Sequence, residues 1–539
     1  MPFSYKKGGG FELNQAMQKN KTTVSRQKAA AQKGGGKMTA KIAARTAYAI
    51  GFALFFGFFS FTYGDVLVRA EQESFFSFDA SLMKYVLDQS NGYLYWAGRF
   101  VLLACKNAWT GALLLAAVFT LTAWLIDRTL RLPAKQCGAG FVLPATVVGW
   151  MLWRGTNIYY KSEPSLIVLV PLGLLLLAAL AAAVSRLLKG RFAFPKDASA
   201  KPFGAAVPAL CVAVLIACAH IFNSNVMLSA RVQNLAQRAE WEQIIEEVRA
   251  AKRPTRTPAA YHAIALVQTG QLLEGMFDIV YDYPDARLDL IEGGEEYAMF
   301  VPDANLYAGL VNAGYRTNMD HVVMDGPRLY YLKRMVQCAI LNEEHRLAEK
   351  YLDIISHNPF EGEFVEKYTA LNNNPKAVEE DAELAAIRTL LPREQRFEQS
   401  YRMPAFLGYN VGLMEGSDAT LVTSAAACLY SKDLQAFLLR AQILAKKGFG
   451  MAKSVMQALA IMSLKDPNIE KMFNIPPYVQ NEVRSFLVEA KPYVKDRYEL
   501  RKNLKKNWLG SYMYYYYCEN NEPDQVRPAT ESNHKAGVN

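Results

Sequence analysis

The last long apolar run of the sequence constrains the architecture more than any other feature. Residues 205–222 read AAVPALCVAVLIACAHIF, with no Lys, Arg, Asp or Glu, and more than three hundred residues of mixed sequence follow them. Such a run can cross a bilayer core, which needs about 17–25 mostly apolar residues. The chain is then anchored in a membrane, and the number of crossings decides which side the large C-terminal part faces.

Four earlier apolar runs precede this one, so we predict a transmembrane domain of about five spans at residues 43–222. The spans lie near 46–63, 108–126, 138–153, 166–184 and 205–222. Helices buried in soluble proteins seldom extend this far without a charge, which favours spans over core helices. The run at 138–153 is the shortest and therefore the weakest of the five.

The loop at 64–107 separates the first two predicted spans. Its apolar residues recur at three- and four-residue spacing, which predicts amphipathic helices in the membrane interface. Tyr93, Tyr95 and Trp96 are expected at headgroup level, where aromatic residues concentrate. A sixth span at 94–105 is the alternative, and its twelve residues would then form a re-entrant helix.

The N-terminal tail, residues 1–42, carries nine Lys or Arg residues and one acid, contains two GGG runs and lacks apolar periodicity. We predict a disordered cytoplasmic tail attracted to anionic lipid headgroups, with ribosome or nucleic-acid binding as the alternative. Because the rest of the chain is near charge balance, no nucleic-acid partner is expected for its body.

Orientation follows from the basic residues, which favour cytoplasmic loops. The side that holds the N-terminus carries about seventeen of them, against six on the other side. With five spans, the part from Asn223 onward lies outside the cytoplasm. We therefore predict a bacterial inner-membrane protein with a periplasmic C-terminal domain.

The C-terminal part, residues 223–517, reads as a series of helical hairpins. The clearest hairpin is GPRLYYLKRMVQCAILNEEHRLAEKYLDIISHNP, residues 326–359, in which each helix has one apolar stripe. The stripes are Leu332, Met335, Val336, Ala339 and Ile340, then Leu347, Ala348, Tyr351, Leu352 and Ile355. Ala348, Tyr351 and the earlier Trp241 suggest tetratricopeptide-type repeats, but no thirty-four-residue period recurs.

The predicted fold class is therefore all-α, with a transmembrane helix bundle followed by an irregular TPR-like α-hairpin solenoid. The tyrosines at 512 and 514–517 are expected to close the solenoid as a terminal helix, because an open end of such an array needs a cap. Residues 518–539 are expected to be a disordered tail.

Part of the sequence resembles a known family. The segment AYHAIALVQTGQLLEGMF, the hairpin RMVQCAILNEEHRLAEKYLDII and the closing LKKNWLGSYMYYYY occur in the order typical of DUF6057. This is an uncharacterised family of Bacteroidota multi-pass membrane proteins. The resemblance implies a membrane region followed by a tetratricopeptide-like extracytoplasmic part, and it implies no catalytic residue.

Candidate chemistry is limited to the acids after the first span. Asp65, Glu71 and Glu73 lie where lipid-linked-sugar glycosyltransferases place a carboxylate that acts as base or binds metal. The seven cysteines form no CxxC pair, and no HExxH, GxGxxG, GxSxG or Walker-type sequence occurs. We therefore expect no cofactor and no metal site, and we favour a scaffold over an enzyme.

The leading hypothesis is a membrane-anchored scaffold that presents a helical-repeat groove to a protein partner in the cell envelope, with membrane lipids as its other partner. The candidate groove-facing residues are Tyr261, Gln268, Arg334 and Asn342. The alternative is a glycosyltransferase-type membrane enzyme that uses the first external loop. A transporter or channel subunit is disfavoured, because the spans hold almost no ionisable residues.

Overall fold

The computed structural model describes residues 42, 44–132, 136–154, 163–187, 206–281, 294–394 and 406–519. Apart from Ile42, the predicted basic tail at 1–42 lies outside these residues, as does the chain after Glu519. The described residues form helices and no strand. They divide into a membrane unit, 1–62, 112–154 and 169–222, and a helical unit, 63–111, 155–168 and 223–539.

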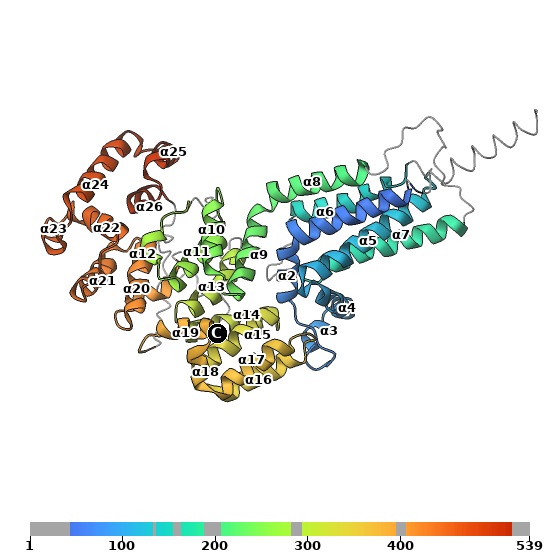
Figure 1. The fold of residues 1–539 in the computed structure, drawn as a ribbon, viewed down its shortest axis with the longest axis horizontal. Helices are drawn as coiled ribbons and strands as arrows, with labels where there is room; N and C mark the ends of the chain where they lie inside the picture. Colours follow the sequence, from blue (N-terminus) through green and yellow to red (C-terminus); the bar gives the residue numbers. More distant parts are fainter. Residues whose placement is uncertain are drawn as a thin grey trace, which may run out of the picture. The chain divides into compact units, whose positions relative to one another are not determined.

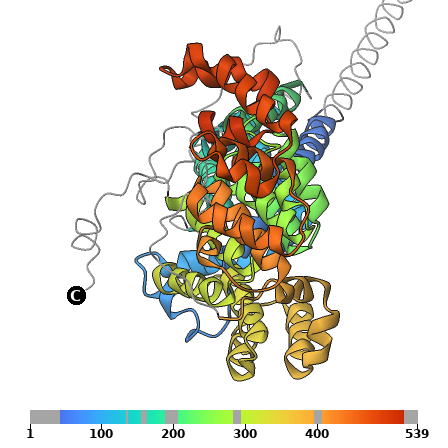
Figure 2. The ribbon, with the colours of Figure 1, turned by 90° about the vertical axis from the view of Figure 1, so that its left-hand side faces the viewer.

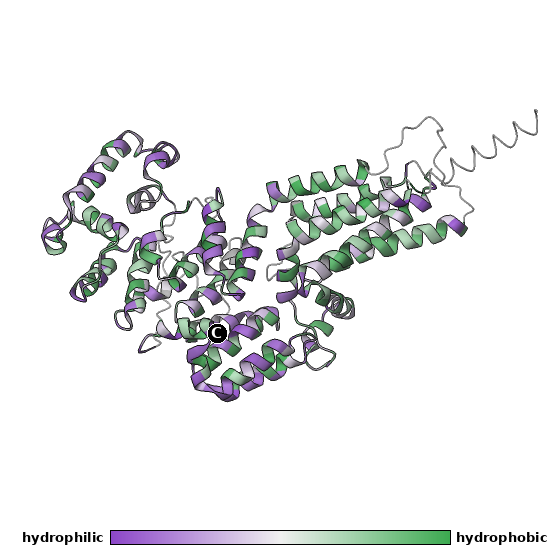
Figure 3. Cartoon of the chain, in the orientation of Figure 1, coloured by the Kyte–Doolittle hydropathy of each residue, from purple (hydrophilic) through white to green (hydrophobic). Residues whose placement is uncertain are grey.

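The membrane unit is made of apolar helices, which Figure 3 shows as the most hydrophobic part of the chain. They are a helix over Ala44–Thr62 that ends in η1 (Phe58–Thr62), α5 (Ala108–Thr129), η3 (Ala139–Phe141), α6 (Val142–Arg154), α7 (Leu166–Leu187) and α8 (Ala206–Phe222). The first residues of α5 and α7 belong to the helical unit.

Three of these helices, Ala44–Thr62, Ala108–Thr129 and Leu166–Leu187, are long and apolar enough to cross a membrane. All five predicted spans are helical, but the other two fall short. Ala139–Leu152 is a shorter apolar helix, and α8 passes only as a bent pair with the following α9. By length and composition the described residues thus hold three candidate spans, or four if the bent pair is one span, which indicates membrane association.

Aromatic side chains form the core of the membrane unit. The ring of Phe55 lies 5.6 Å from that of Phe119 and 5.5 Å from that of Phe141. Gly51 makes room for this packing, since a Cβ atom there would lie 2.3 Å from the Phe141 ring. The carboxylate of Asp127 accepts hydrogen bonds from Tyr48 and from the backbone of the turn that opens η3.

The helical unit begins with the segment between the first two apolar helices and continues after α8 (Figures 1 and 2). Its first helices are α2 (Gly64–Gln72), α3 (Lys84–Leu87), α4 (Gly92–Leu102) and η2 (Leu103–Lys106). After α8 come α9 (Ser224–Gln237), α10 (Trp241–Ala250), α11 (Arg256–Gln268), α12 (Leu272–Gly275), α13 (Gly294–Tyr307), α14 (Val311–Asp325), α15 (Leu329–Leu341), α16 (His345–Ser356), α17 (Gly362–Asn373), α18 (Pro375–Glu380) and α19 (Ala382–Thr389).

The chain then forms η4 (Gly408–Gly412), α20 (Asp418–Tyr430), α21 (Leu434–Lys446), α22 (Lys453–Ser463), α23 (Asn468–Phe473), α24 (Pro477–Ala490), η5 (Lys491–Tyr493), α25 (Arg497–Trp508) and α26 (Tyr512–Cys518). Consecutive helices pack on one another through most of the unit. The orange and red helices α20–α26 lie together in Figures 1 and 2, and α22 contacts α21, α23, α24 and α26.

The hairpin α15–α16 confirms the apolar stripes expected at 326–359. All five stripe positions of α15 are buried, and so are four of the five on α16, where Leu347 is half-buried. However, α15 is buried on nearly every side, since α13, α14, α16, α17 and α19 all contact it. It is a central helix of the unit rather than an amphipathic one, whereas α16 is amphipathic.

Eight turns that follow helices in the described residues close in the same way. The residue after the helix has a left-handed backbone, and the next N–H donates to a carbonyl five residues back. The left-handed residues are Arg131, Ala239, Gly270, Gly309, Glu343, Lys432, Gly448 and Asn474. This is the Schellman termination, which satisfies the last carbonyls of a helix. Five of the eight positions are not glycine, so the turn recurs without a constant sequence signal.

Two predicted boundaries differ from the structure. The loop at 64–107 was assigned to the membrane domain, but α2 packs on α9 and residues such as Phe75 and Val86 join the core of the helical unit. The predicted disordered tail at 518–539 begins too early, because Cys518 ends α26 and Glu519 is buried and paired with Arg501.

The closing tyrosines pack inward. Tyr512 and Tyr515 are buried, and their rings lie 5.2 and 4.7 Å from the ring of Phe277. The hydroxyl of Tyr515 also donates to the backbone oxygen of Tyr430. The expected terminal helix therefore exists, and it contacts residues far earlier in the chain as well as its nearest hairpin.

Candidate functional site

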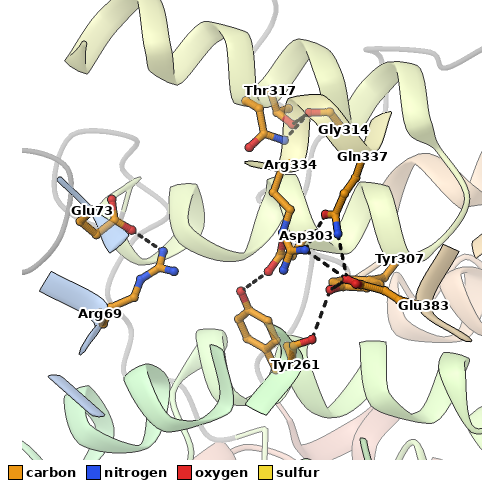
Figure 4. A network of polar contacts seen from close by, with 12 residues as sticks. Arg69, Glu73, Tyr261, Asp303, Tyr307, Gly314, Thr317, Arg334, Gln337 and Glu383 are labelled. Atoms are coloured by element: carbon orange, nitrogen blue, oxygen red, sulfur yellow. Dashed lines mark hydrogen bonds and ion pairs between the residues drawn. The ribbon is translucent and has the colours of Figure 1, made fainter. Parts of the chain in front are cut away.

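The most unusual feature of the helical unit is a network of buried charged side chains in its core (Figure 4). It starts in α2, which follows the first apolar helix. Val66, Leu67 and Ala70 make α2 apolar on one side, yet Arg69 and Glu71 on it are buried too. Buried charges are costly unless they are paired, so each of these groups requires a partner.

Glu73 is held between two arginines. Its Oε1 pairs with Arg69, four residues earlier, and its Oε2 accepts a 2.8 Å hydrogen bond from Nη1 of Arg328 at the start of α15. The Arg69 guanidinium also lies over the ring of Tyr330, 4.1 Å from its centroid. Burial alone lowers the pKa of Arg69, but the neighbouring Glu73 carboxylate raises it overall, so the guanidinium stays charged.

Glu71 faces a second set of charges. Gln72 donates a 2.7 Å hydrogen bond to its Oε2, and the surrounding charges are Glu361, Lys333 and Lys106. Both lysines pair with Glu361, at 2.7 and 2.8 Å. Burial, together with the charge of Glu361, raises the pKa of Glu71 to about 7. Glu71 thus retains its proton to a higher pH than an ordinary glutamate does.

Asp303 on α13 lies between Tyr261 and Arg334, as Figure 4 shows. The Tyr261 hydroxyl donates a 2.6 Å hydrogen bond to Oδ2, and Nε of Arg334 lies 2.8 Å from Oδ1. All three side chains are buried. Burial, and then the charge of Asp303, raises the pKa of Tyr261 well above its ordinary value, so this phenol stays protonated.

Glu383 on α19 accepts hydrogen bonds from three other helices. Tyr307 and Tyr368 donate to its two oxygens at 2.8 and 3.3 Å. Arg334 and Gln337 donate to Oε1 at 3.3 and 3.1 Å. Tyr368 in turn accepts from Gln337 at 2.6 Å. The carboxylate therefore joins α13, α15, α17 and α19 in the middle of the unit.

The network is nearly balanced in charge. Arg69, Arg328 and Arg334 face Glu73, Asp303 and Glu383, so each cation has an acidic neighbour. Each of its carboxylates accepts hydrogen bonds or ion pairs from two or more donors. Such an arrangement fixes helices against one another; it offers neither a free base nor an activated nucleophile.

The sequence-predicted catalytic acids are separated by this geometry. Asp65 accepts a 3.0 Å hydrogen bond from Nδ2 of Asn234 on α9. Glu71 and Glu73 point to different partners, the lysines with Glu361 and the two arginines respectively. The three acids are thus not brought to one point.

The predicted groove residues fall into two groups. Tyr261 and Arg334 meet at Asp303, and both are buried in the core. Gln268 is close by, since its Nε2 donates to the backbone oxygen of Tyr307 at 2.7 Å. Asn342 is apart from them and donates to Asn312 at the surface. None of the first three side chains is openly exposed to a partner.

Sequence reasoning missed three members of the network: Asp303, Arg328 and Glu383. Asp303 had a local signal, because it is the lone charge in the apolar stretch FVPDANLY. Arg328 and Glu383 had none, since each occurs among residues typical of a solvated helix end. Only their distant partners distinguish them.

Among the described residues, no group of three or more His, Cys, Asp or Glu side chains is placed to hold a metal ion. Comparison with known proteins gives one finding. Residues 38–195 and 163–519 match the model of a family of unknown function, DUF6057. No curated protein and no solved structure matches the chain.

Proposed function

The chain belongs to the DUF6057 family, and from its architecture we propose that it is an inner-membrane-anchored scaffold for protein–protein interaction. Its TPR-like helical unit would lie in the periplasm of a diderm bacterium and bind a protein partner in envelope assembly or secretion. The N-terminus would lie in the cytoplasm, as the distribution of basic residues favours.

One observation carries this proposal: the acids that follow the first apolar helix are used to build the helical unit. Glu73 is neutralised by Arg69 and Arg328, and Asp65 is hydrogen-bonded to Asn234. Since these acids are paired within the helical unit, their segment would serve to join the membrane anchor to an interaction domain. The recurring Schellman turns and the amphipathic α16 support a hairpin array, the architecture with which many proteins bind peptides.

The alternative is an envelope enzyme of glycosyltransferase type that uses the same loop. One observation favours it: Glu71 has its pKa raised to about 7, the range suited to a general base or acid near neutral pH. Buried ion-pair networks also produce such shifts, and the neighbouring lysines and Glu361 form one.

Complementation of a deletion strain separates the two functions. A scaffold tolerates Asp65→Asn and Glu71→Gln, because neither variant removes a buried ion pair. An enzyme that depends on these acids loses function although the protein level stays normal. Glu349→Gln, at an exposed position of α16, is the matched control. Loss of complementation in Glu71→Gln at normal protein level would reject the scaffold.

Partner and orientation need their own measurements. Crosslinking followed by co-purification from native membranes is expected to yield a stable envelope protein together with the chain. A periplasm-specific reporter fused after Asn539 is expected to be active. Activity of a cytosol-specific reporter at the same position would overturn the proposed orientation.

A further inference from the structure

Helix α4 exposes apolar residues and buries its charged residue, the reverse of a helix on the surface of a soluble domain. Its exposed residues are Tyr93, Leu94, Ala97 and Phe100, all apolar or aromatic and all on one face. Its single charged residue, Arg99, is on the buried face. There Nε and Nη2 donate to the two carboxylate oxygens of Glu163 at 2.9 and 2.8 Å. A helix beside water shows the opposite pattern.

The exposed face continues beyond the helix. The ring of Phe78 lies 5.0 Å from that of Phe76 and 5.9 Å from that of Phe100. The large side chains of this surface are widely exposed: Phe78 68%, Tyr93 80%, Leu94 55% and Phe100 50%. We call these four residues the aromatic face. Scattered exposed apolar residues are ordinary, but a contiguous group indicates a binding surface.

The aromatic face differs from the headgroup contacts expected from the sequence. Of the three residues predicted there, only Tyr93 points outward. Tyr95 and Trp96 are half-buried on the core of the helical unit, and the Trp96 indole donates to the backbone oxygen of Ser77 at 3.2 Å.

We propose that the aromatic face is a docking surface of the helical unit for the interfacial layer of a lipid bilayer. Its chemistry fits this layer, where Tyr and other aromatic side chains concentrate. Its position in the chain supports the same occupant: only η2 and Asn107 separate α4 from α5, a helix apolar and long enough to span a membrane. The face is therefore held within a few residues of the bilayer by the chain itself.

This inference depends on membrane anchoring and is independent of the scaffold function. It predicts that the helical unit touches lipid through α4 as well as being tethered to it. The buried Arg99–Glu163 pair keeps the only charge of α4 away from the lipid, so the helix needs no charged group to enter the interface.

Quenching by brominated lipid tests the proposal on the full chain. Leu94→Trp and Tyr93→Trp are reconstituted into vesicles of phosphatidylcholine or of dibrominated phosphatidylcholine. For each variant, the fluorescence of the wild-type chain is subtracted. The remaining fluorescence is then compared between the two kinds of vesicle. Tyr498→Trp is the control, at a position on α25 that is 71% exposed. The added fluorescence at 93 and 94 is expected to fall about twofold in brominated vesicles, and that at 498 to stay unchanged.

Aqueous iodide supplies the opposing measurement. Fluorescence at 93 and 94 that iodide quenches and brominated lipid does not would place the face in water and overturn the proposal. Insensitivity to both quenchers would place a protein surface on it, such as a second copy of the chain, and would overturn it equally. The two variants guard against a local misfolding of either one.

Discussion

Glu73 and Arg328 are separated by 255 residues of sequence, and their side chains meet at 2.8 Å in the core of the helical unit. The pair joins the segment that leaves the first apolar helix to the beginning of α15. Beside it, the backbone oxygen of Ser74 accepts a 2.9 Å hydrogen bond from the N–H of Leu329. The membrane-proximal segment is thus a structural part of the helical unit.

Glu73→Gln is expected to destabilise the helical unit by about 3–5 kcal/mol, because it leaves Arg69 and Arg328 buried without their shared carboxylate. Denaturant titration in detergent, followed by labelling of the buried Cys338 thiol, measures the change. Glu349→Gln, an exposed substitution of the same chemistry, is expected to change stability by less than about 0.5 kcal/mol. Equal effects of the two variants would show that the pairing contributes nothing.

Glu71 is expected to make the folded unit less stable as pH rises. Its pKa is about 7 in the folded chain, against an ordinary value of 4.5, so the folded state holds the proton more tightly than the unfolded state. The contribution of the Glu71 proton to the free energy of unfolding is fully present below about pH 4.5 and is lost as pH rises through about 7. It amounts to about 3 kcal/mol, because each unit of pKa difference corresponds to about 1.4 kcal/mol.

Glu71→Gln removes this titration while keeping the shape of the side chain. Unfolding free energies measured from pH 4.5 to 8 for both chains are expected to diverge with rising pH, with the variant the more stable at pH 8. Subtracting one curve from the other cancels the pH dependence that other groups contribute. One such group is His262, for which burial lowers the pKa to about 3. A constant difference across the range would contradict the assignment.

Phe75 and Phe78 form a matched pair of phenylalanines three residues apart. Phe75 is 1% exposed in the core of the helical unit, whereas Phe78 belongs to the aromatic face. Phe75→Ala is expected to cost about 3–5 kcal/mol, since it leaves a cavity. Phe78→Ala is expected to cost less than about 0.5 kcal/mol in detergent. Thermal unfolding of both chains measures this, and a reversed order would refute the burial of residues 63–77.

Two substitutions at the left-handed turns are expected to change stability in opposite directions. A Cβ atom on Gly309 would lie 2.3 Å from the backbone oxygen of Leu390, so Gly309→Ala is expected to destabilise by more than about 1 kcal/mol. Glu343→Gly relieves a left-handed non-glycine residue and is expected to stabilise by a few tenths to about 1 kcal/mol. Melting temperatures compare them, and a destabilising Glu343→Gly would argue against the turn geometry.

Local pattern was enough to predict much of the fold. The apolar runs became helices near their predicted positions, and the stripes of α15 and α16 are buried. Helical periodicity and hydropathy are properties of neighbouring residues, so a short window contains the information. The number of spans was harder to predict from the sequence, because some apolar helices, such as the one that contains α6, are shorter than a span.

The candidate site could not be predicted in the same way, because it depends on contacts between residues that are far apart in the sequence. Tyr261, Arg334 and Glu73 were singled out from the sequence for other roles, and their actual partners are Asp303, Glu383 and Arg328. Whether a carboxylate is a solvated acid, a base or half of a buried pair depends on its burial and on neighbouring charges. These are set only when distant helices pack.

The amino-acid sequence alone determined that the chain is helical, that it has an apolar N-terminal part and that hairpins follow, because hydrophobic spacing acts over a few residues. Tertiary structure alone decided that residues 63–111 belong to the helical unit and that Glu73, directly after α2, is neutralised there. The physical reason is that a buried charge persists only beside a partner, and here that partner is supplied from hundreds of residues away.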